Sequence, residues 1–175
     1  MELTGKRIAV LVEQQYQELE VWYPVYRLRE AGATVTLVGP EKGKIYSSKL
    51  GYPVKSDKSA DEVSSDDFDA LVIPGGFSPD YIRRSHAMID LVSDMTRRNK
   101  PVAAICHGPW VLCSTTALKG KKATCFSSIK DDITNAGAIY VDAEVVVDGN
   151  IITSRKPDDL PAFCRAIIQA IRDSK

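Results

Sequence analysis

The sequence has no excess of either charge: 23 lysines and arginines balance 23 aspartates and glutamates among 175 residues. A nucleic-acid or anionic-membrane binder usually carries an excess of basic residues, so neither partner is predicted. No apolar run approaches the ~20 residues that a membrane span needs. The first residues also lack the charged region, the apolar region and the cleavage site that follow one another in a signal peptide. The sequence therefore predicts a cytoplasmic protein.

Histidine and cysteine, the usual ligands of zinc, are also scarce. There are only two histidines and four cysteines, and no two cysteines have the C-x-x-C spacing of a zinc site. The cysteines are then expected to be reduced thiols. The Gly75-Gly76 pair is not a phosphate-binding loop, because it lacks the later glycine and the lysine of that motif. We therefore predict no metal and no nucleotide or flavin cofactor.

The composition is that of an ordinary globular protein, with 44% hydrophobic and 26% charged residues. The length corresponds to about one domain, and we find no internal repeat, low-complexity stretch or linker. We predict a single domain over residues 1–175.

Short apolar runs alternate with helical patterns along the chain. Strands that are covered on both faces read as continuous apolar runs, and four such runs are predicted at 7–12, 34–38, 70–73 and 101–105. Helices are predicted at 19–31, 79–98 with a break and N-cap at Ser85, 107–116 and 158–173. This alternation predicts an α/β fold with a mostly parallel sheet and helices on both faces.

The remaining segments are shorter. Edge strands, arranged as a hairpin, are expected at 44–46 and 52–56, and a helical turn at 60–68. Strand-like runs at 144–147 and 151–153 flank Asp148-Gly149-Asn150, a tight-turn sequence that predicts a second hairpin. Further strands are expected at 123–126 and 139–141, with a polar helix near 129–135.

One cysteine lies between a predicted buried strand and a helix start. Cys106 follows Ile105, and Gly108 comes two residues later. This is the layout of a nucleophile elbow, a sharp strand-to-helix turn that holds one side chain above the sheet. A helix N-terminus favours the thiolate, so we expect a lowered pKa for Cys106. The alternative is that Cys106 is a small buried apolar residue, as most cysteines are.

Groups that could assist the thiol lie at neighbouring strand ends. The N–H groups of Gly75, Gly76 and His107 could form an oxyanion hole, although the glycine pair alone could be an ordinary turn. His107 could move a proton near neutral pH, but adjacent side chains at such a junction often point apart, so it could need an acid to orient it. The acids Glu13, Glu18 and Glu20 follow the first strand, and the residue pattern alone does not choose among them.

Several segments resemble one family in chain order. Residues 103–109 (AAICHGP) resemble the nucleophile segment of the PfpI family, which consists of intracellular cysteine peptidase-like proteins and belongs to the protein deglycase superfamily. Residues 69–81 (DALVIPGGFSPDY) resemble its oxyanion turn, and residues 133–137, 142–149 and 153–163 resemble its tail. The resemblance implies a flavodoxin-like three-layer sandwich, related to class I glutamine amidotransferases.

The resemblance also implies roles for individual residues. It implies Cys106 as the nucleophile, His107 as its base, Glu20 as the acid that hydrogen-bonds the sulfur, and Gly76 as an oxyanion donor. An acid after the glycine turn, here Asp80 where the family often has glutamate, would reach the histidine of a neighbouring subunit. A homo-oligomer, either a dimer or a hexamer, is therefore expected.

Four further residues are expected to line the pocket: Gln17, Trp110, Phe126 and Arg155. Gln17 stands where many relatives carry an acid, Phe126 where many carry tyrosine or histidine, and Trp110 where glutamine is common. The aromatic groups at 110 and 126 predict a tighter and more apolar pocket than is usual in the family. The alternative for these three departures is plain packing.

These observations predict a cysteine-dependent hydrolase-type stress enzyme. Its substrate would be a small aldehyde or its adduct, as for a deglycase or glyoxalase, or a peptide, as for an intracellular protease. We favour the aldehyde adduct, because nothing in the sequence indicates an extended peptide groove. The alternative is a redox-sensing or chaperone-like stress protein with an oxidisable cysteine and no turnover.

Overall fold

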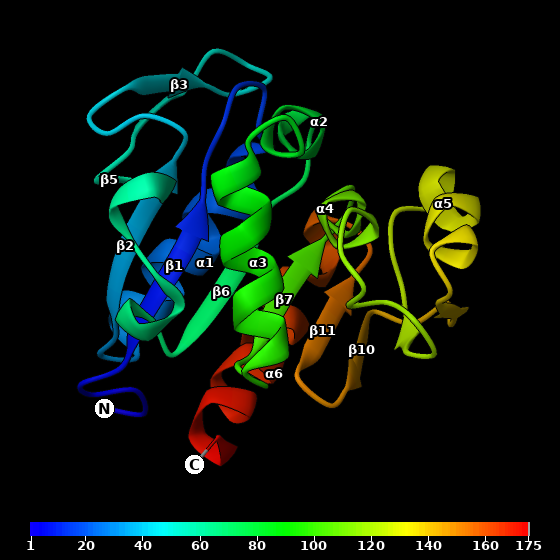
Figure 1. Ribbon diagram of the computed structural model, residues 1–175. Helices are drawn as coiled ribbons and strands as arrows, with labels where there is room; N and C mark the ends of the chain where they lie inside the picture. Colours follow the sequence, from blue (N-terminus) through cyan, green and yellow to red (C-terminus); the bar gives the residue numbers. More distant parts are fainter. Residues whose placement is uncertain (175) are drawn as a thin grey trace.

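The computed structural model describes residues 1–174, and a seven-stranded sheet runs through the middle of the molecule (Figure 1). Its strands stand in the order β10-β11-β7-β6-β1-β2-β5. All neighbouring pairs are parallel except β10 and β11, which form an antiparallel hairpin at one edge. The strands are β1 (Arg7–Leu11), β2 (Thr34–Gly39), β5 (Lys58–Ser59), β6 (Ala70–Ile73), β7 (Val102–Ile105), β10 (Val145–Asp148) and β11 (Ile151–Ser154).

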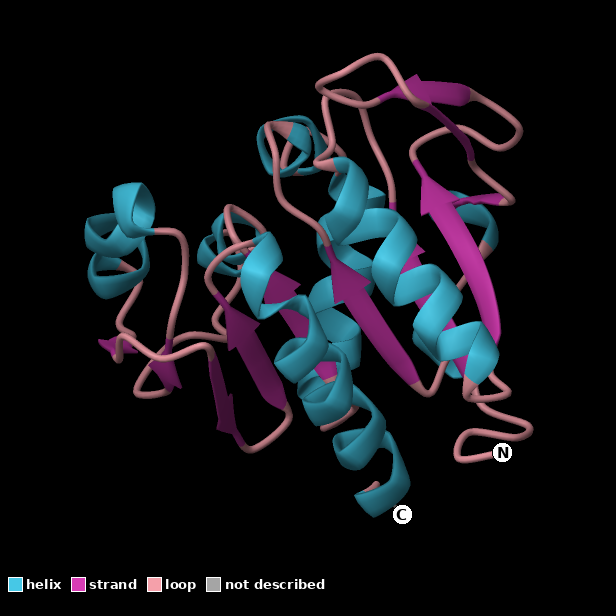
Figure 2. Ribbon diagram, turned by 180° about the vertical axis from the view of Figure 1, so that it is seen from behind, coloured by secondary structure: helices cyan, strands magenta, loops and turns pink. Residues whose placement is uncertain are grey.

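Helices cover both faces of this sheet. Figure 2 shows two long helices across one face, α1 (Glu18–Glu30) and α6 (Leu160–Asp173). The opposite face carries α3 (His86–Arg97), with α2 (Ser78–Ile82), α4 (Pro109–Cys113) and α5 (Lys130–Asn135) on the same side of the molecule. The predicted three-layer α/β sandwich is confirmed.

The alternation of side chains along the strands divides the core into two parts. Ile8 and Val10 of β1 pack toward α1 and α6, whereas Ala9 and Leu11 pack toward α3 and α4. Both sets are fully buried, which is why β1 reads as a continuous apolar run rather than an alternating one. The interior strands β1, β6 and β7 are therefore the most strongly specified part of the fold.

Of two predicted helical segments, one has its break where expected and the other is shorter than predicted. The predicted break in 79–98 is confirmed, since the Ser85 hydroxyl accepts a hydrogen bond from Met88 N–H and caps α3. The helix expected at 107–116 is only Pro109–Cys113. It ends early because hydroxyl side chains there hydrogen-bond the backbone, with Thr115 Oγ1 donating to the carbonyl of Leu112.

Short elements complete the chain. The predicted first hairpin is present as β3 (Ile45–Ser47) and β4 (Pro53–Lys55), but it forms its own two-stranded sheet instead of an edge of the central one. Residues 60–68 form two 3-10 turns, η1 (Ala60–Glu62) and η2 (Ser65–Asp67). A second small sheet pairs β8 (Lys122–Ala123) with β9 (Ile139–Tyr140). The last 3-10 turns are η3 (Ser127–Ile129) and η4 (Pro157–Asp159).

The loop after β1 joins the first hairpin to the turn that follows β6. Tyr16 bridges Ser48 on one side and Gly76 on the other. Gln15 N–H donates to the carbonyl of Ser47 at 2.7 Å, and the carbonyl of Gln15 accepts from Phe77 N–H at 2.9 Å. The backbone of residues 15–17 thus lies between two loops that are distant in sequence.

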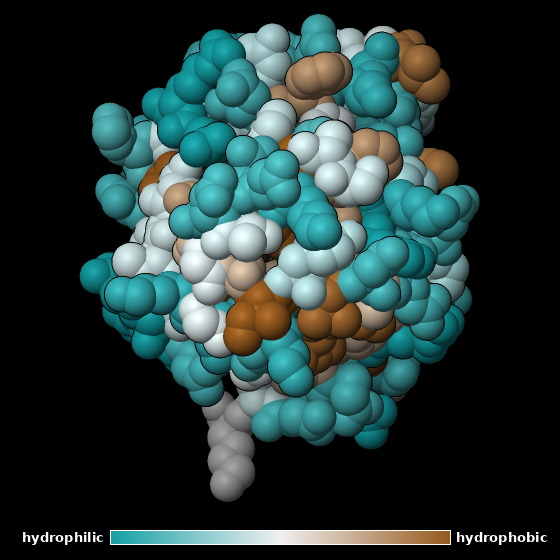
Figure 3. Space-filling view, turned by 90° about the vertical axis from the view of Figure 1, so that its right-hand side faces the viewer, coloured by the Kyte–Doolittle hydropathy of each residue, from teal (hydrophilic) through white to brown (hydrophobic). Residues whose placement is uncertain are grey.

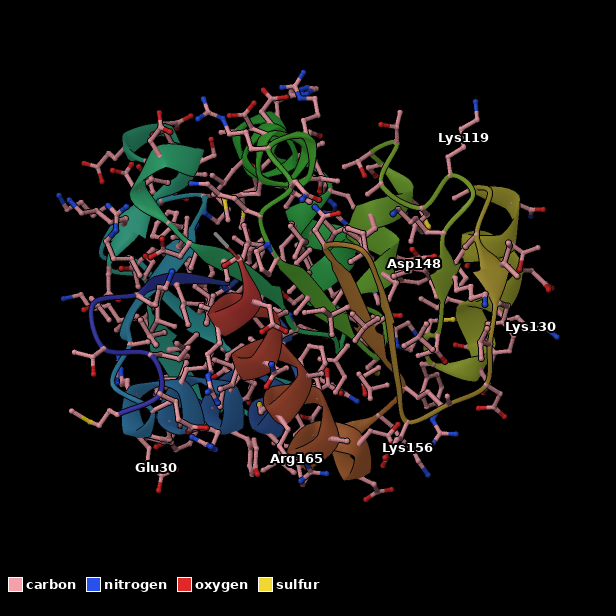
Figure 4. The ribbon with its side chains drawn as sticks, turned by 90° about the horizontal axis from the view of Figure 1, so that it is seen from below. Glu30, Lys119, Lys130, Asp148, Lys156 and Arg165 are labelled. Atoms are coloured by element: carbon pink, nitrogen blue, oxygen red, sulfur yellow. The ribbon has the colours of Figure 1, made fainter. Side chains whose placement is uncertain are left out.

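Charged side chains of both signs lie on the surface. Figure 4 shows Glu30, Lys119, Lys130 and Arg165 at the edge of the molecule, pointing away from its body. On the side that Figure 3 shows, apolar side chains appear as small groups between hydrophilic ones. Within residues 1–174, no helix is long and apolar enough to cross a membrane.

Candidate active site

The predicted site residues converge at the carboxyl ends of three central strands. Cys106 and His107 follow β7, Gly75 and Gly76 follow β6, and Glu20 lies in the first turn of α1, which follows β1. These strands are neighbours in parallel register, so their carboxyl ends meet at one edge of the sheet. Ligands of open α/β sheets bind at this edge.

The turn at Cys106 has the strained geometry of a nucleophile elbow. Cys106 has a φ of +62°, in the left-handed region that non-glycine residues rarely adopt. A Cβ added at Gly108 would lie 2.6 Å from the carbonyl oxygen of Ile73 and 2.7 Å from that of Ile105, so only glycine fits there. The predicted sharp strand-to-helix turn at Cys106 is present.

Glu20 is the acid that lies beside the thiol. It is fully buried, and its Oε2 accepts a hydrogen bond from Gly75 N–H at 2.7 Å. The carboxyl acts electrostatically on the Cys106 thiol, and its Oε1 is buried without a hydrogen-bond partner within residues 1–174. Glu18 points elsewhere, since its Oε1 accepts from Leu50 N–H at 2.8 Å. The structure thus separates two acids that the residue pattern left as alternatives.

The thiol and the carboxyl disfavour each other's charge. Burial raises the pKa of Glu20 to about 7, against the hydrogen bond from Gly75. Burial and then the Glu20 charge raise the pKa of Cys106 to about 12, although the N–H groups of Gly76 and His107 lower it. The expectation of a lowered Cys106 pKa is therefore wrong. The pair therefore loses its two protons in separate steps, the first of them from Glu20 near pH 7.

This coupling predicts the effect of Glu20→Gln on Cys106 labelling by iodoacetamide. At pH 8–9 the wild-type carboxyl is ionised and holds the pKa of Cys106 high. The neutral amide removes that repulsion, so each unit by which the thiol pKa falls increases the thiolate fraction about tenfold. We expect labelling of Cys106 at least about tenfold faster in the variant at pH 8–9, measured by peptide mapping, since the wild-type thiol loses its protonated neighbour above pH 7.

The matched control is Glu18→Gln, which removes a carboxylate two residues away. It should leave the labelling rate of Cys106 at the wild-type value over the same pH range. Equal rates in the wild type and in Glu20→Gln at pH 8–9 would remove the role of Glu20 in setting the thiol pKa.

The oxyanion donors are only partly those expected. The backbone N–H groups of Gly76 and His107 both point to the Cys106 sulfur. Gly75 was expected to donate as well, but its N–H is occupied by the Glu20 carboxyl. Gly75 instead allows its backbone to lie close to Glu20 and Cys106, because an added Cβ would lie 2.6 Å from Glu20 Oε2 and 2.8 Å from Cys106 Cβ. The structure thus corrects the role predicted for Gly75.

His107 faces the thiol, despite its position next in the chain. Its Nδ1 lies 3.4 Å from Cys106 Sγ, and its Nε2 lies 3.2 Å from Ser128 Oγ. The ring stacks on Phe126 and meets Trp110 edge-on, both at 5.1 Å between centroids. Burial, helped by the charge of Lys49, lowers the pKa of His107, so the ring is neutral near pH 7.

The acid predicted to reach a neighbouring histidine lies on the surface of its own chain. Asp80 is exposed in α2, where its carboxylate pairs with Arg84. Within residues 1–174 the Nε2 atom of His107 meets the Ser128 hydroxyl rather than an acid. A role for Asp80 across a subunit boundary stays a prediction.

The four residues expected to line the pocket have different surroundings. Gln17 caps α1, because its Oε1 accepts from Glu20 N–H at 3.0 Å, and so it supports the acid. Trp110 and Phe126 enclose the His107 ring, and Trp110 Nε1 donates to Asp132 at 2.8 Å. Arg155 is held by two carboxylates, those of Asp142 and Asp159.

Two other residues near the site could not be identified from the sequence. Lys49, from the loop between β3 and β4, lowers the pKa of both Glu20 and His107. Ser128, in η3, contacts the histidine ring. Neither residue belongs to a motif, and only the folded chain brings them to the site. Among the described residues, no group of three or more His, Cys, Asp or Glu side chains could hold a metal ion.

The fold and this strained turn define an α/β protein with a nucleophile elbow that carries cysteine. The family model described as "DJ-1/PfpI family" matches residues 6–170. The chain belongs to the DJ-1/PfpI family, as its motifs predicted.

Individual relatives extend over almost the whole chain. The chain is 48% identical to "Putative cysteine protease YraA" of Bacillus subtilis, over 96% of this chain and 99% of that protein. It is 43% identical to "Deglycase PfpI" of Pyrococcus furiosus, over 95% and 99% of the two chains. The crystal structure of Drosophila melanogaster DJ-1beta superposes with a TM-score of 0.90 at 31% identity, covering 98% of this chain and 92% of that one. The predicted family and fold are confirmed.

Proposed function

We propose that this chain is a cysteine hydrolase that removes small aldehyde adducts from amines, with Cys106 as its nucleophile. The observation that carries the proposal is the contact of one strained cysteine with both a buried carboxyl and a neutral imidazole. A thiol that served only for packing would need neither neighbour. The relatives named as a deglycase and as a cysteine protease support the same class of chemistry.

The proposed reaction begins with the transfer of the Cys106 proton to Nδ1 of His107. The sulfur then forms a bond to the carbinol carbon that joins the aldehyde residue to the amine, and the C–N bond breaks as the amine leaves with the proton from His107. Neutral His107 can next move the hydrogen of that carbon, as a proton, to the adjacent carbonyl carbon through an enediolate, whose oxygen the N–H groups of Gly76 and His107 would bind. Water finally releases the resulting acyl group from sulfur as a hydroxy acid, and the thiol is restored.

The neutral state of Glu20 supports this chemistry. Burial raises the pKa of Glu20 to about 7, so a large share of the protein carries a protonated carboxyl at neutral pH. A protonated carboxyl can donate a hydrogen bond to a thiolate, whereas a carboxylate would repel it. Glu20 would thus permit an ionised sulfur in a buried position.

Accessibility favours an adduct over a peptide as substrate. Cys106 is 8% exposed, and aromatic rings enclose the neighbouring histidine. A small adduct can reach such an atom with less rearrangement than an extended peptide chain, which needs a long groove. We therefore place the aldehyde adduct first and the peptide second.

The experiment compares two substrates with one protein preparation. The purified chain is incubated with a methylglyoxal-modified amino acid and, separately, with a fluorogenic peptide, each beside Cys106→Ser. Amine release that depends on Cys106 supports the proposal, and peptide cleavage that depends on it supports a protease instead. If neither substrate is turned over while Cys106 oxidises readily to sulfinate, the redox-sensing alternative is favoured.

We further propose that the protein works as a homo-oligomer, a dimer or a hexamer built from dimers. Its support is an apolar surface over α1 and the β3–β4 hairpin, where Leu19, Tyr26, Leu50 and Tyr52 are all more than half exposed. These side chains line a groove of about 500 Å³. Apolar patches of this kind on a protein surface often mark subunit contacts. A neighbouring copy could also bring Asp80 to His107.

We expect a mass in solution that is a multiple of the 19.2 kDa chain, measured by light scattering. The physical reason is the burial of the exposed aromatic side chains between copies. As a matched pair of variants, Leu50→Lys should lower the mass, whereas Lys119→Glu, on the periphery, should not. An active 19.2 kDa monomer would contradict both the oligomer and the shared acid.

A further inference from the structure

Trp110 connects the His107 ring to helix α5. Its indole meets the imidazole at 5.1 Å between ring centroids, with an interplanar angle of 74°. Its Nε1 donates a hydrogen bond to Asp132 Oδ2 at 2.8 Å. Within residues 1–174 this is the only side-chain hydrogen bond that joins α4 to α5. Asp132 is therefore linked to the histidine through a single aromatic side chain.

We propose that Asp132 is a positioning residue, which holds the Trp110 indole against His107 and so keeps Nδ1 of the ring within reach of the Cys106 thiol. This inference rests on the proposed function, in which His107 accepts the thiol proton. Among the hydrogen bonds of residues 1–174, none joins the indole to the imidazole. The contact therefore leaves both ring nitrogens to the thiol and to an acid, including an acid from a neighbouring copy of the chain.

Phe126 alone would leave the imidazole free to move. It stacks on the ring at an interplanar angle of 26°, and such a pair is held by only a weak attraction, so it can slide or separate. The Trp110 ring stands nearly perpendicular to the imidazole and opposes these movements from another direction. Because Nδ1 lies 3.4 Å from Cys106 Sγ, a small displacement of the ring would interrupt the proton transfer.

The Trp110 side chain needs an anchor of its own. It lies on α4, which has only 5 residues, and it is only partly buried. Packing alone therefore does not fix the direction in which the indole points. A hydrogen bond from Nε1–H to a carboxylate is charge-assisted, and it is stronger than a bond between neutral groups. The bond to Asp132 thus determines which side of the indole faces the histidine.

The charge of Asp132 has an effect that differs from that of its hydrogen bond. The charged and titratable groups that act on His107 are the Cys106 thiol, Lys49 and Asp132. Burial and the charge of Lys49 lower the pKa of the ring, and the charge of Asp132 raises it. Asparagine in place of Asp132 removes the charge, but its amide oxygen can still accept from Nε1–H. Alanine removes both, so the two variants separate the charge from the bond.

The kinetic test compares Asp132→Ala with Asp131→Ala in the full chain. Asp131 is the exposed neighbour in α5 and carries the same charge. We expect Asp132→Ala to lower kcat for the methylglyoxal-modified amino acid about tenfold, with KM changed less than about twofold, because the base is displaced while the substrate still binds. Asp132→Asn should keep at least about half of the wild-type kcat, and Asp131→Ala all of it. An unchanged kcat in Asp132→Ala, or equal losses in the alanine and asparagine variants, overturns the inference.

A second readout does not depend on turnover. The chain has two tryptophans, so a Trp22→Phe background leaves Trp110 as the only indole. A protonated imidazole quenches the fluorescence of an indole that it contacts, so emission should fall as His107 takes up a proton. Because burial lowers the pKa of His107, this quenching should appear on the acid side of the ordinary histidine range. His107→Gln in the same background should abolish it.

The same variants then test the anchor. We expect Asp132→Ala to reduce the acid quenching of Trp110 at least about twofold, because the indole turns away from the histidine. Asp132→Asn and Asp131→Ala should keep the quenching of the background protein. Equal quenching in Asp132→Ala and in the background overturns the placement of Asp132. If the wild type turns over neither substrate while the quenching depends on Asp132 as expected, the proposed function is refuted and this placement stands.

Discussion

Cys106→Ser should lower the turnover of an amine-linked aldehyde adduct by about 10³-fold or more. The environment of residue 106 already opposes ionisation, since burial and the Glu20 charge raise the pKa of the thiol to about 12. A serine hydroxyl is a much weaker acid than a thiol, so its anion would not form to a useful extent at the same position. His107 cannot compensate, because it can accept a proton only as readily as the neighbouring atom releases it.

The serine variant should still fold, because a hydroxyl is slightly smaller than a thiol and the left-handed backbone at residue 106 is unchanged. Thermal unfolding within a few degrees of the wild type would establish this. Cys113→Ser is the matched control, since Cys113 lies at the end of α4 and is only partly buried. It should keep wild-type turnover. Activity in Cys106→Ser above a tenth of the wild-type value would exclude Cys106 as the nucleophile.

Gly75→Ala should destabilise the protein by about 3 kcal/mol or more and abolish activity. An added Cβ at this position would lie 2.6 Å from Glu20 Oε2, 2.8 Å from Cys106 Cβ and 2.9 Å from His107 N. Two of these neighbours belong to the backbone or to a Cβ atom, which cannot move without moving β7. The third is the carboxyl that Gly75 N–H binds, so relief of the clash would leave a buried acid without its donor.

Urea unfolding, monitored by circular dichroism, measures the loss of folding stability. The rate of Cys106 labelling reports on the integrity of the site. Gly120→Ala is the control: its φ is +73°, and an added Cβ meets no atom within 4 Å. Gly120→Ala should be destabilised only by the cost of placing alanine in a left-handed backbone conformation, about 1–2 kcal/mol. If Gly75→Ala unfolds at the same urea concentration as the wild type, the two strand ends are not in close contact.

The framework of the fold could be predicted from the sequence because its signals are local. The run 7–12 is apolar at successive positions, which identifies a strand covered on both faces, and the break at Ser85 shows as a capping residue. The elbow at Cys106 has a similar local signature, a strand followed by a cysteine and a glycine. Each of these segments carries its own pattern within a few residues.

The rest of the site depends on distances between segments that no local pattern contains. Glu18 and Glu20 look alike in the sequence, and only the direction of α1 decides which carboxyl is buried beside the thiol. That burial also reverses the expected direction of the Cys106 pKa. Ser128 reaches His107 from 21 positions away. The sequence therefore predicts which residues are able to react, but not how neighbouring groups change their pKa or orient their side chains.

The short backbone stretch around Tyr16 connects the outer hairpin with the site. Tyr16 is paired with Ser48 on one side and with Gly76 on the other, and Gly76 donates toward the reactive sulfur. A contact that shifts the hairpin by a fraction of an ångström must therefore also shift a proposed oxyanion donor. If copies of the chain associate through this hairpin, catalytic competence and subunit association would be thermodynamically linked, and dilution alone would lower the specific activity.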